Sequence, residues 1–214
     1  MHEELENIER NEVCVLIEPP PQCNPIGTKW VFKNKQGEDG VVGFCLKEGI
    51  DYEETFAPIA ILEAIRILLA LAALKGFKLF QMDVKSAFLN GYIEEEVYVR
   101  KPPGFEHPKF PNVVYKLQKA LYGLKQAPRA WYERLRKFLF DQGFQMGSVD
   151  KTLFLLRHGK DLLIMSREFE MSIMGELQFF FGLHIRQTPQ GTFVHQSKYT
   201  RDLLWKFEMA DATP

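Results

Sequence analysis

Asp83 is the residue whose type and position most directly suggest chemistry, because it stands at the polar end of an apolar, strand-like segment. A carboxylate at the edge of a sheet can bind a hard divalent cation such as Mg²⁺. An aspartate at a strand end more often forms a turn or caps a helix. Taken alone, the position of Asp83 therefore favours a structural role, in a turn or as a helix cap.

Basic side chains gather later in the chain and suggest contacts with phosphate groups. The stretch from Lys116 to Lys151 contains eight lysines and arginines against three acidic residues. Lysine and arginine neutralise phosphates in nucleic-acid complexes. Such a run is also typical of a solvated helix face, which stays open as the alternative.

Three helices are predicted around these residues. Apolar residues recur at the period of one helix face over 62–75, and a glycine follows as a C-terminal stop. A second helix begins at Pro128, which suits a first turn, and ends before Gly143. An amphipathic helix is predicted over 198–209. The second helix is expected to bury Trp131, Leu135, Phe138 and Leu139.

Strands are predicted between and after the helices. An apolar strand over 77–84 carries Asp83 near its end, and hairpins are expected to turn at Gly159 and at 189–191. A weaker hairpin pattern covers 30–42. Helices combined with mostly hairpin-linked strands favour an α+β fold, in which helices cover one face of a mixed or antiparallel sheet.

The composition is that of a globular protein, with 46% hydrophobic and 26% charged residues in a chain of 214. Collagen-like, low-complexity and wholly disordered chains are excluded. The formal net charge of −1 gives no overall sign of nucleic-acid binding. The charge is unevenly distributed along the chain. Residues 1–65 carry 13 acidic and 5 basic side chains, so the remaining residues have a net charge of about +7.

Cysteine content and the N-terminus indicate the compartment. Three irregularly spaced cysteines fit neither a zinc motif nor a disulfide scaffold. The first residues lack the features of a secretory signal or a transit peptide, and charges interrupt the most apolar run, over 60–74. We therefore expect an intracellular protein, cytoplasmic or nuclear, that is neither secreted nor transmembrane.

Six sequence motifs occur in a fixed order along most of the chain. They are GIDYEETFAPIA (49–60), IRILLALAA (65–73), QMDVKSAFLNG (81–91), EEEVYVRKPPGF (94–105), YKLQKALYGLKQAPRAWYERL (115–135) and MGELQFFFGLHI (174–185). Together they closely resemble the reverse transcriptase segment of copia-type LTR retrotransposon Pol polyproteins. The resemblance covers 27–214, and it implies an RNA-directed DNA polymerase with a right-hand palm, built on a ferredoxin-like sheet with helices on one face, and partial fingers.

The resemblance also implies roles for individual residues. Asp83 corresponds to the first catalytic, Mg²⁺-binding carboxylate, Val84 to a backbone contact with the deoxynucleoside triphosphate, and Phe88 to the side chain that excludes a ribose 2′-hydroxyl. Without the motif, Phe88 is better explained as a core aromatic. Contacts with the RNA template and DNA primer are implied for Gly123, Lys125 and Arg129. The segment 174–185 resembles the primer-grip hairpin.

Two pieces of the family pattern are missing from the sequence. Relatives carry a Tyr-Val-Asp-Asp hairpin and a following helix where this chain passes directly from residue 164 to 165. They also carry a Lys-Ala-Arg-Leu-Val strand at the junction of residues 42 and 43. The resulting domain prediction is an N-terminal arm over 1–26 and a fingers and palm domain over 27–214, with deletions near 42/43 and 164/165.

Three hypotheses follow. The chain is a catalytically inactive remnant of a reverse transcriptase, because no Asp-Asp dipeptide occurs anywhere in it. Alternatively, it is an incomplete gene model of an active enzyme, from which both segments were removed as introns. The third hypothesis is a non-catalytic nucleic-acid-binding module that keeps the basic region over 116–151.

Overall fold

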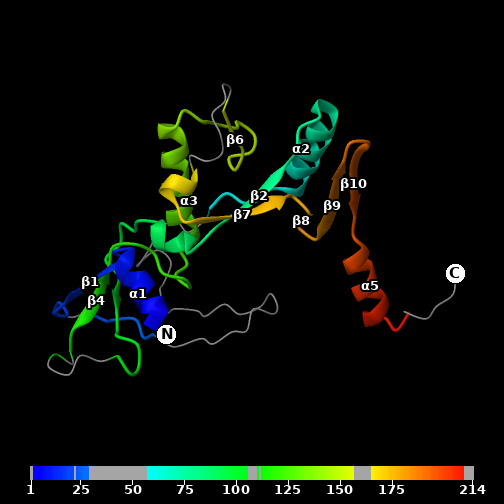
Figure 1. The fold of residues 1–214 in the computed structure, drawn as a ribbon. Coiled ribbons are helices and arrows are strands. Elements are labelled where there is room, and N and C mark those ends of the chain that lie inside the picture. The colour runs from blue at the N-terminus through cyan, green and yellow to red at the C-terminus, as the bar shows by residue number, and fades with distance from the viewer. Residues whose placement is uncertain are drawn as a thin grey trace. The chain divides into compact units, whose positions relative to one another are not determined.

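The structure is a computed structural model that describes residues 2–21, 23–28, 57–105, 110, 112–156 and 165–209. Its contacts divide the chain into two compact units. The first unit contains Met1–Pro58, Ser86–Gln145 and Phe154–Arg157, and the second contains Ile59–Lys85, Met146–Leu153 and His158–Pro214. Figure 1 shows the helices and strands of both units.

A three-stranded antiparallel sheet organises the first unit. Its strand order is β1-β4-β3, formed by β1 (Cys14–Ile17), β4 (Val114–Leu117) and β3 (Tyr98–Val99). Helix α1 (His2–Arg10) precedes β1, and Ile26 forms a bridge to Val99. Residues on both sides of the predicted 26/27 boundary thus belong to one unit, and the division into an arm and a domain stays a prediction.

Helix α3 (Ala127–Asp141) covers the core of this unit. It contacts the short 3-10 helix η1 (Ala87–Asn90), and the core gathers side chains from the sheet and from both helical segments. The prediction of a helix beginning near Pro128 is confirmed, since the proline occupies its first turn. Phe138 and Leu139 are buried as expected, while Trp131 and Leu135 are half-buried. The strands β5 (Gln145–Met146) and β6 (Phe154–Leu155) follow and pair with each other.

The second unit contains two small sheets and three helices within the described residues. Strand β2 (Phe80–Val84) pairs antiparallel with β7 (Met171–Glu176), and a second sheet has the order β10-β9-β8. Its strands are β8 (Phe179–Phe180), β9 (Leu183–Thr188) and β10 (Gly191–His195), and the helices are α2 (Leu62–Lys75), α4 (Met165–Glu168) and α5 (Ser197–Lys206). Leu69 of α2 packs with Leu183 and Ile185 of β9 in the core.

Several predicted elements of this unit are confirmed. Helix α2 ends at Lys75, and Gly76 adopts the left-handed conformation (φ 70°) of a glycine cap. The hairpin of β9 and β10 turns at residues 189–190, as expected. Helix α5 ends three residues before the predicted end at 209. Helices mixed with antiparallel strands give the α+β class.

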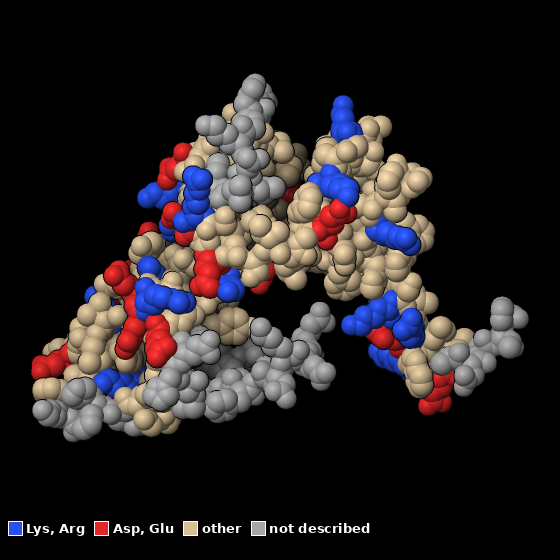
Figure 2. Space-filling view, in the orientation of Figure 1, with Lys and Arg blue, Asp and Glu red and all other residues tan. Residues whose placement is uncertain are grey.

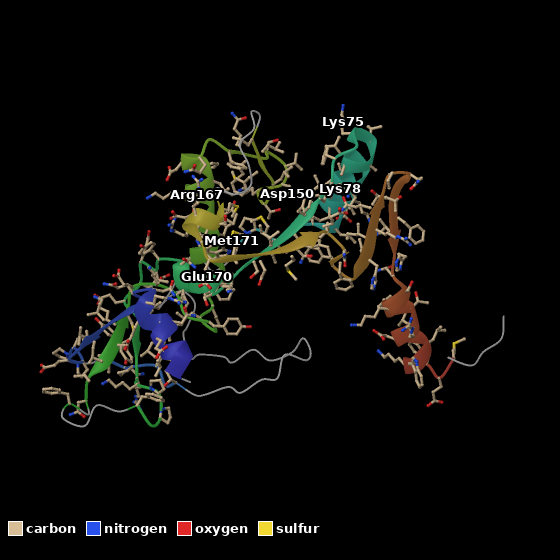
Figure 3. All side chains as sticks on the ribbon, in the orientation of Figure 1. Lys75, Lys78, Asp150, Arg167, Glu170 and Met171 are labelled. Carbon is tan, nitrogen blue, oxygen red and sulfur yellow. The ribbon has the colours of Figure 1, made fainter. Side chains whose placement is uncertain are left out.

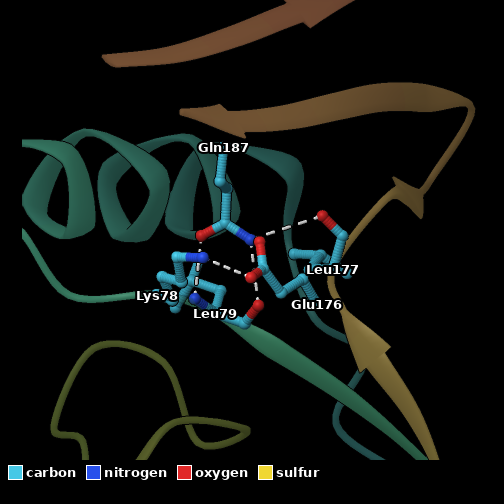
Figure 4. Close-up of polar contacts among 5 residues, drawn as sticks. All are labelled: Lys78, Leu79, Glu176, Leu177 and Gln187. Atoms are coloured by element: carbon cyan, nitrogen blue, oxygen red, sulfur yellow. Dashed lines mark hydrogen bonds and ion pairs between the residues drawn. The ribbon is translucent and has the colours of Figure 1, made fainter. Parts of the chain in front are cut away.

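Strand β2 begins at Phe80, three residues later than predicted. The preceding residue, Leu79, donates its backbone N–H to Gln187 Oε1 (2.8 Å), and its carbonyl accepts from Gln187 Nε2 (2.9 Å) and from the N–H of Leu177 (2.8 Å). Figure 4 shows this contact, in which the Gln187 amide bonds like a strand partner. The backbone at Leu79 is thus satisfied outside the β2–β7 ladder.

Some predictions fall outside the described residues. The weak hairpin over 30–42, the turn at Gly159 and the junction near 42/43 lie in segments that the structure does not describe. The junction at 164/165 borders the described chain, which continues with α4 from Met165. No helix among the described residues is long and apolar enough to cross a bilayer.

Candidate functional site

Asp83 lies on β2, directly opposite Ser172 of β7, and its side chain is exposed. The next residue, Val84, is half-buried and lies opposite Met171. Beyond the strand, Lys85 donates its backbone N–H to the carbonyl of Glu170 (2.9 Å) and pairs with the Glu170 carboxylate (3.0 Å). Figure 3 places Glu170 and Met171 at the start of β7, so this ion pair closes the end of the ladder that carries Asp83.

The carboxylates around this ladder do not form a metal-binding group. In the described part of the chain, no set of three or more His, Cys, Asp or Glu residues is placed to hold an ion. Glu170 is paired with Lys85, and Glu176 at the other end of β7 is paired with Lys78. Mg²⁺ usually keeps one or two carboxylates and completes its shell with water and phosphates. The residues present therefore do not fit a two-ion polymerase centre.

Phe88 lies in the first unit, on η1. Its side chain is half-buried and packs against the core cluster that includes Leu124 and Ala127. The ring contacts Tyr122, with centroids 5.7 Å apart and planes inclined by 33°. Tyr122 itself is 81% exposed, so the pair presents one half-buried and one accessible aromatic ring. Phe88 thus combines a packing role with contact to an exposed ring.

The loop before α3 holds the predicted phosphate-contacting residues. Gly123 has a φ of 97°, a backbone conformation that residues with a side chain rarely adopt. Lys125 is exposed in the loop before α3, and Arg129 is half-buried on the first turn of the helix. The structure places Gly123, Lys125 and Arg129 in the same unit as Phe88, while Asp83 and Val84 belong to the other unit.

Two residues of this region were missed by sequence reasoning. Gln126, at the start of α3, is only 3% exposed, yet neither atom of its amide has a hydrogen-bond partner among the described residues. Gly91 packs directly on the backbone of α3, where a side chain would collide with Ala130 and Trp131. The glycine at the end of the motif QMDVKSAFLNG was the available signal for this close approach.

Part of the basic stretch over 116–151 serves the protein's own structure. Lys116 binds Glu96 (2.5 Å), and this contact raises the pKa of the lysine and lowers that of the carboxyl group. Lys119 donates to the carbonyl of Asn11 (2.6 Å) and lies over the Tyr92 ring. Figure 2 shows acidic and basic side chains interspersed on the visible face. Lys116 and Lys119 thus contribute to the packing of the first unit.

Comparison with known families decides the identity of the domain. A family model described as reverse transcriptase (RNA-dependent DNA polymerase) matches residues 11–166. The chain belongs to the reverse transcriptase family.

Relatives of this reverse transcriptase domain include plant retrotransposon proteins. The chain is 35% identical to the retrovirus-related Pol polyprotein from transposon RE2 of Arabidopsis thaliana, over 92% of this chain and 16% of that protein. It is also 35% identical to the Pol polyprotein from transposon TNT 1-94 of Nicotiana tabacum, over 100% of this chain and 19% of that protein. The chain thus spans less than one fifth of the length of these relatives. No solved structure matches it.

The alignments also record residues that this chain lacks. The alignment with the tobacco relative extends over 251 positions, whereas the chain has 214 residues. At least 37 positions of the alignment therefore hold no residue of this chain.

Proposed function

We propose that the chain is a catalytically inactive reverse transcriptase domain of a copia-type retrotransposon, comprising the palm and part of the fingers. The observation that carries the proposal is the isolation of Asp83. Its register partner on β7 is Ser172, and the described residues contain no group of three or more potential metal ligands. Two metal ions must align the primer hydroxyl with the triphosphate, and one exposed carboxylate gives them no shared anchor.

The missing segments account for this isolation. The family's other metal-binding carboxylates would come from the Tyr-Val-Asp-Asp hairpin, and the sequence contains no Asp-Asp dipeptide. At least 37 alignment positions that hold no residue of this chain support the proposal that segments are missing from it. Loss of the fingers strand would also remove cations that neutralise the triphosphate. Both electrostatic components of nucleotidyl transfer are then absent.

Primer extension tests the proposal. The purified chain is given a DNA primer on an RNA template, deoxynucleoside triphosphates and Mg²⁺ or Mn²⁺, and the product length is measured. We expect no extension, and an Asp83→Asn variant should give the same result as the original chain. Template-dependent extension that Asp83→Asn abolishes would overturn the proposal and would show that Asp83 acts with ligands outside the described residues.

Inspection of the encoding DNA separates a remnant from an incomplete gene model. If the genomic sequence at both junctions contains the hairpin and the fingers strand in frame, an enzyme with both segments restored should extend the primer. If the junctions are continuous in the DNA, the deletions belong to the gene itself.

A second candidate function is nucleic-acid binding without catalysis. It is favoured by the exposed Tyr122 ring on Phe88 beside the loop and first turns of α3, where Lys125 and Arg129 lie. We propose that Val84, Phe88 and Gly123 keep their family positions in nucleotide or nucleic-acid contacts. Affinity for an RNA–DNA duplex should then fall with salt, and a Lys125→Ala/Arg129→Ala variant should lower the salt slope by about 2. An affinity for the duplex that does not change with salt concentration would contradict this function.

A further inference from the structure

Strand β10 is the outermost strand of its sheet, and its free side has no partner strand among the described residues. It pairs with β9 alone, in the order β10-β9-β8, as Figure 1 shows. An edge strand presents unpaired backbone N–H and C=O groups, which can bind a strand of another chain. The free side of β10 is therefore a candidate interaction surface.

The register shows which backbone groups of β10 point outward. Ile185 of β9 donates its N–H to the carbonyl of Gln178 (2.8 Å), on the side away from β10. Residues of an antiparallel ladder alternate between pairs that exchange hydrogen bonds and pairs that do not, so Val194, opposite Ile185, belongs to a pair of the second kind. The N–H and C=O of Val194 and of Thr192 therefore point to the free side, where they bond to no described residue.

The sequence of β10 lacks the features that usually protect such an edge. Natural sheets protect their edges with charged side chains, proline or a bulge. The sequence GTFVH contains no Lys, Arg, Asp, Glu or Pro, and its register with β9 is regular. Phe193 is 62% exposed and Val194 is 41% exposed, so the accessible side chains of this edge are apolar.

The other edge strands in the described part of the chain are shorter or better protected. Strand β2 contains Asp83, and β7 contains Glu176 and lies opposite an irregularity in the register of β2. Strand β1 is followed directly by Glu18 and three prolines. The strands β3, β5, β6 and β8 have two residues each. Strand β10 is thus the edge most open to pairing.

We propose that β10 pairs antiparallel with β10 of a second copy of this chain, about a two-fold axis at Phe193. This register places Thr192 opposite Val194 of the second copy, and the reverse. Both residues direct their backbone groups to this side, so each of the two pairs can exchange both of its N–H···O=C bonds. The two sheets then continue as one sheet across the axis.

The side chains of β10 are compatible with this self-pairing. Phe193 lies opposite its own copy in a pair without hydrogen bonds, where side chains approach most closely, and aromatic cross-strand pairs stabilise sheets. His195 lies opposite Gly191, which has no side chain to obstruct it. An isologous interface requires a patch that matches itself, and no like charges oppose each other here. This self-complementarity favours a second copy over an unrelated partner.

The interface is small, because the strand has five residues. We therefore expect a reversible, concentration-dependent dimer rather than a permanent one. The proposal does not rest on the proposed loss of catalysis, since neither Asp83 nor the loop before α3 takes part.

Sedimentation velocity of the full chain over a range of concentrations tests the proposal. The original chain should show a monomer–dimer equilibrium. Phe193→Lys should weaken the dimer at least tenfold, because it sets two lysines directly opposite each other. Thr192→Pro should do the same, because it removes the outward N–H and leaves the ladder with β9 intact. Ile173→Lys is the matched control, since it replaces a 64% exposed apolar residue on β7 and should dimerise as the original chain does.

Hydrogen exchange covers the case in which a variant does not fold. In the original chain, the amides of Thr192 and Val194 should exchange more slowly as the protein concentration rises. A chain that stays monomeric, a dimer that both β10 variants retain, or a dimer without this added protection would overturn the proposal. Neither measurement depends on polymerase activity, so this proposal can fail while the proposed function stands.

Discussion

Gly91 lies so close to helix α3 that the packing of η1 on the helix depends on its missing side chain. An ideal Cβ at this position would stand 2.6 Å from the backbone carbon of Ala130 and 2.6 Å from the backbone nitrogen of Trp131. The glycine is also held by hydrogen bonds on both sides. Its N–H donates to the carbonyl of Phe88 (3.0 Å), and its own carbonyl accepts from Ala120 (2.8 Å).

The Gly91→Ala substitution should therefore destabilise the first unit strongly. Overpacking costs about 1–3 kcal/mol, and the upper end applies because helix backbone gives way less than a flexible side chain. Weakening one of the hydrogen bonds adds about 1 kcal/mol. We expect a loss of about 4 kcal/mol, which at a slope of about 2 kcal/mol per molar lowers the urea midpoint by about 2 M.

Urea unfolding followed by tryptophan fluorescence measures this effect. Gly27→Ala is the matched control, because Gly27 belongs to the same unit and a Cβ there would meet no atom within 4 Å. The urea midpoint of the control should stay the same or rise slightly, because alanine has less conformational freedom than glycine in the unfolded chain. Equal midpoints for the two variants would refute the inferred packing of η1 on α3.

Three further predictions concern polar groups. Gln126→Met should stabilise the chain by about 1–3 kcal/mol, since it removes an unpartnered buried amide; a lowered melting temperature would contradict this. Gln187→Ala should cost about 2 kcal/mol and speed hydrogen exchange at the Leu79 amide; unchanged protection there would count against the bridge. Burial, and to a lesser extent the charge of Glu9, raises the pKa of Cys14 to about 11. Alkylation of Cys14 at pH 8, followed by mass spectrometry, should be at least about tenfold slower than in the urea-unfolded chain, and equal rates would show that the thiol is not buried.

Elements set by local pattern could be predicted from the sequence. The ends of helix α2 were predicted correctly because the signals for them, the apolar period and Gly76, lie within one short stretch of sequence. The β9–β10 hairpin follows for the same reason, since its strands adjoin a short turn. Family motifs located Asp83 and Phe88, but their catalytic roles stay predictions.

Features set by distant contacts could not be predicted. Nothing near Phe80 indicates that its strand pairs with β7, or that Leu79 bonds to Gln187 instead. The partners of Lys116 and Lys119 also lie on other segments, so the basic run alone overstated the charge available to phosphates. Such contacts depend on which segments meet after folding, and local sequence patterns do not record them.

The pairing of β2 with β7 has a consequence for the order of synthesis. Met171 leaves the ribosome 87 residues after Val84, its partner in the ladder. At about 5–20 residues per second, the strand of Asp83 waits roughly 4–17 s for its partner. Most of the first unit is translated in that interval, because residues 86–145 interrupt the second unit in the sequence. The second unit can therefore close only after β7 has been translated, and a chain that stops before β7 would leave its apolar strand open to chaperones and proteases.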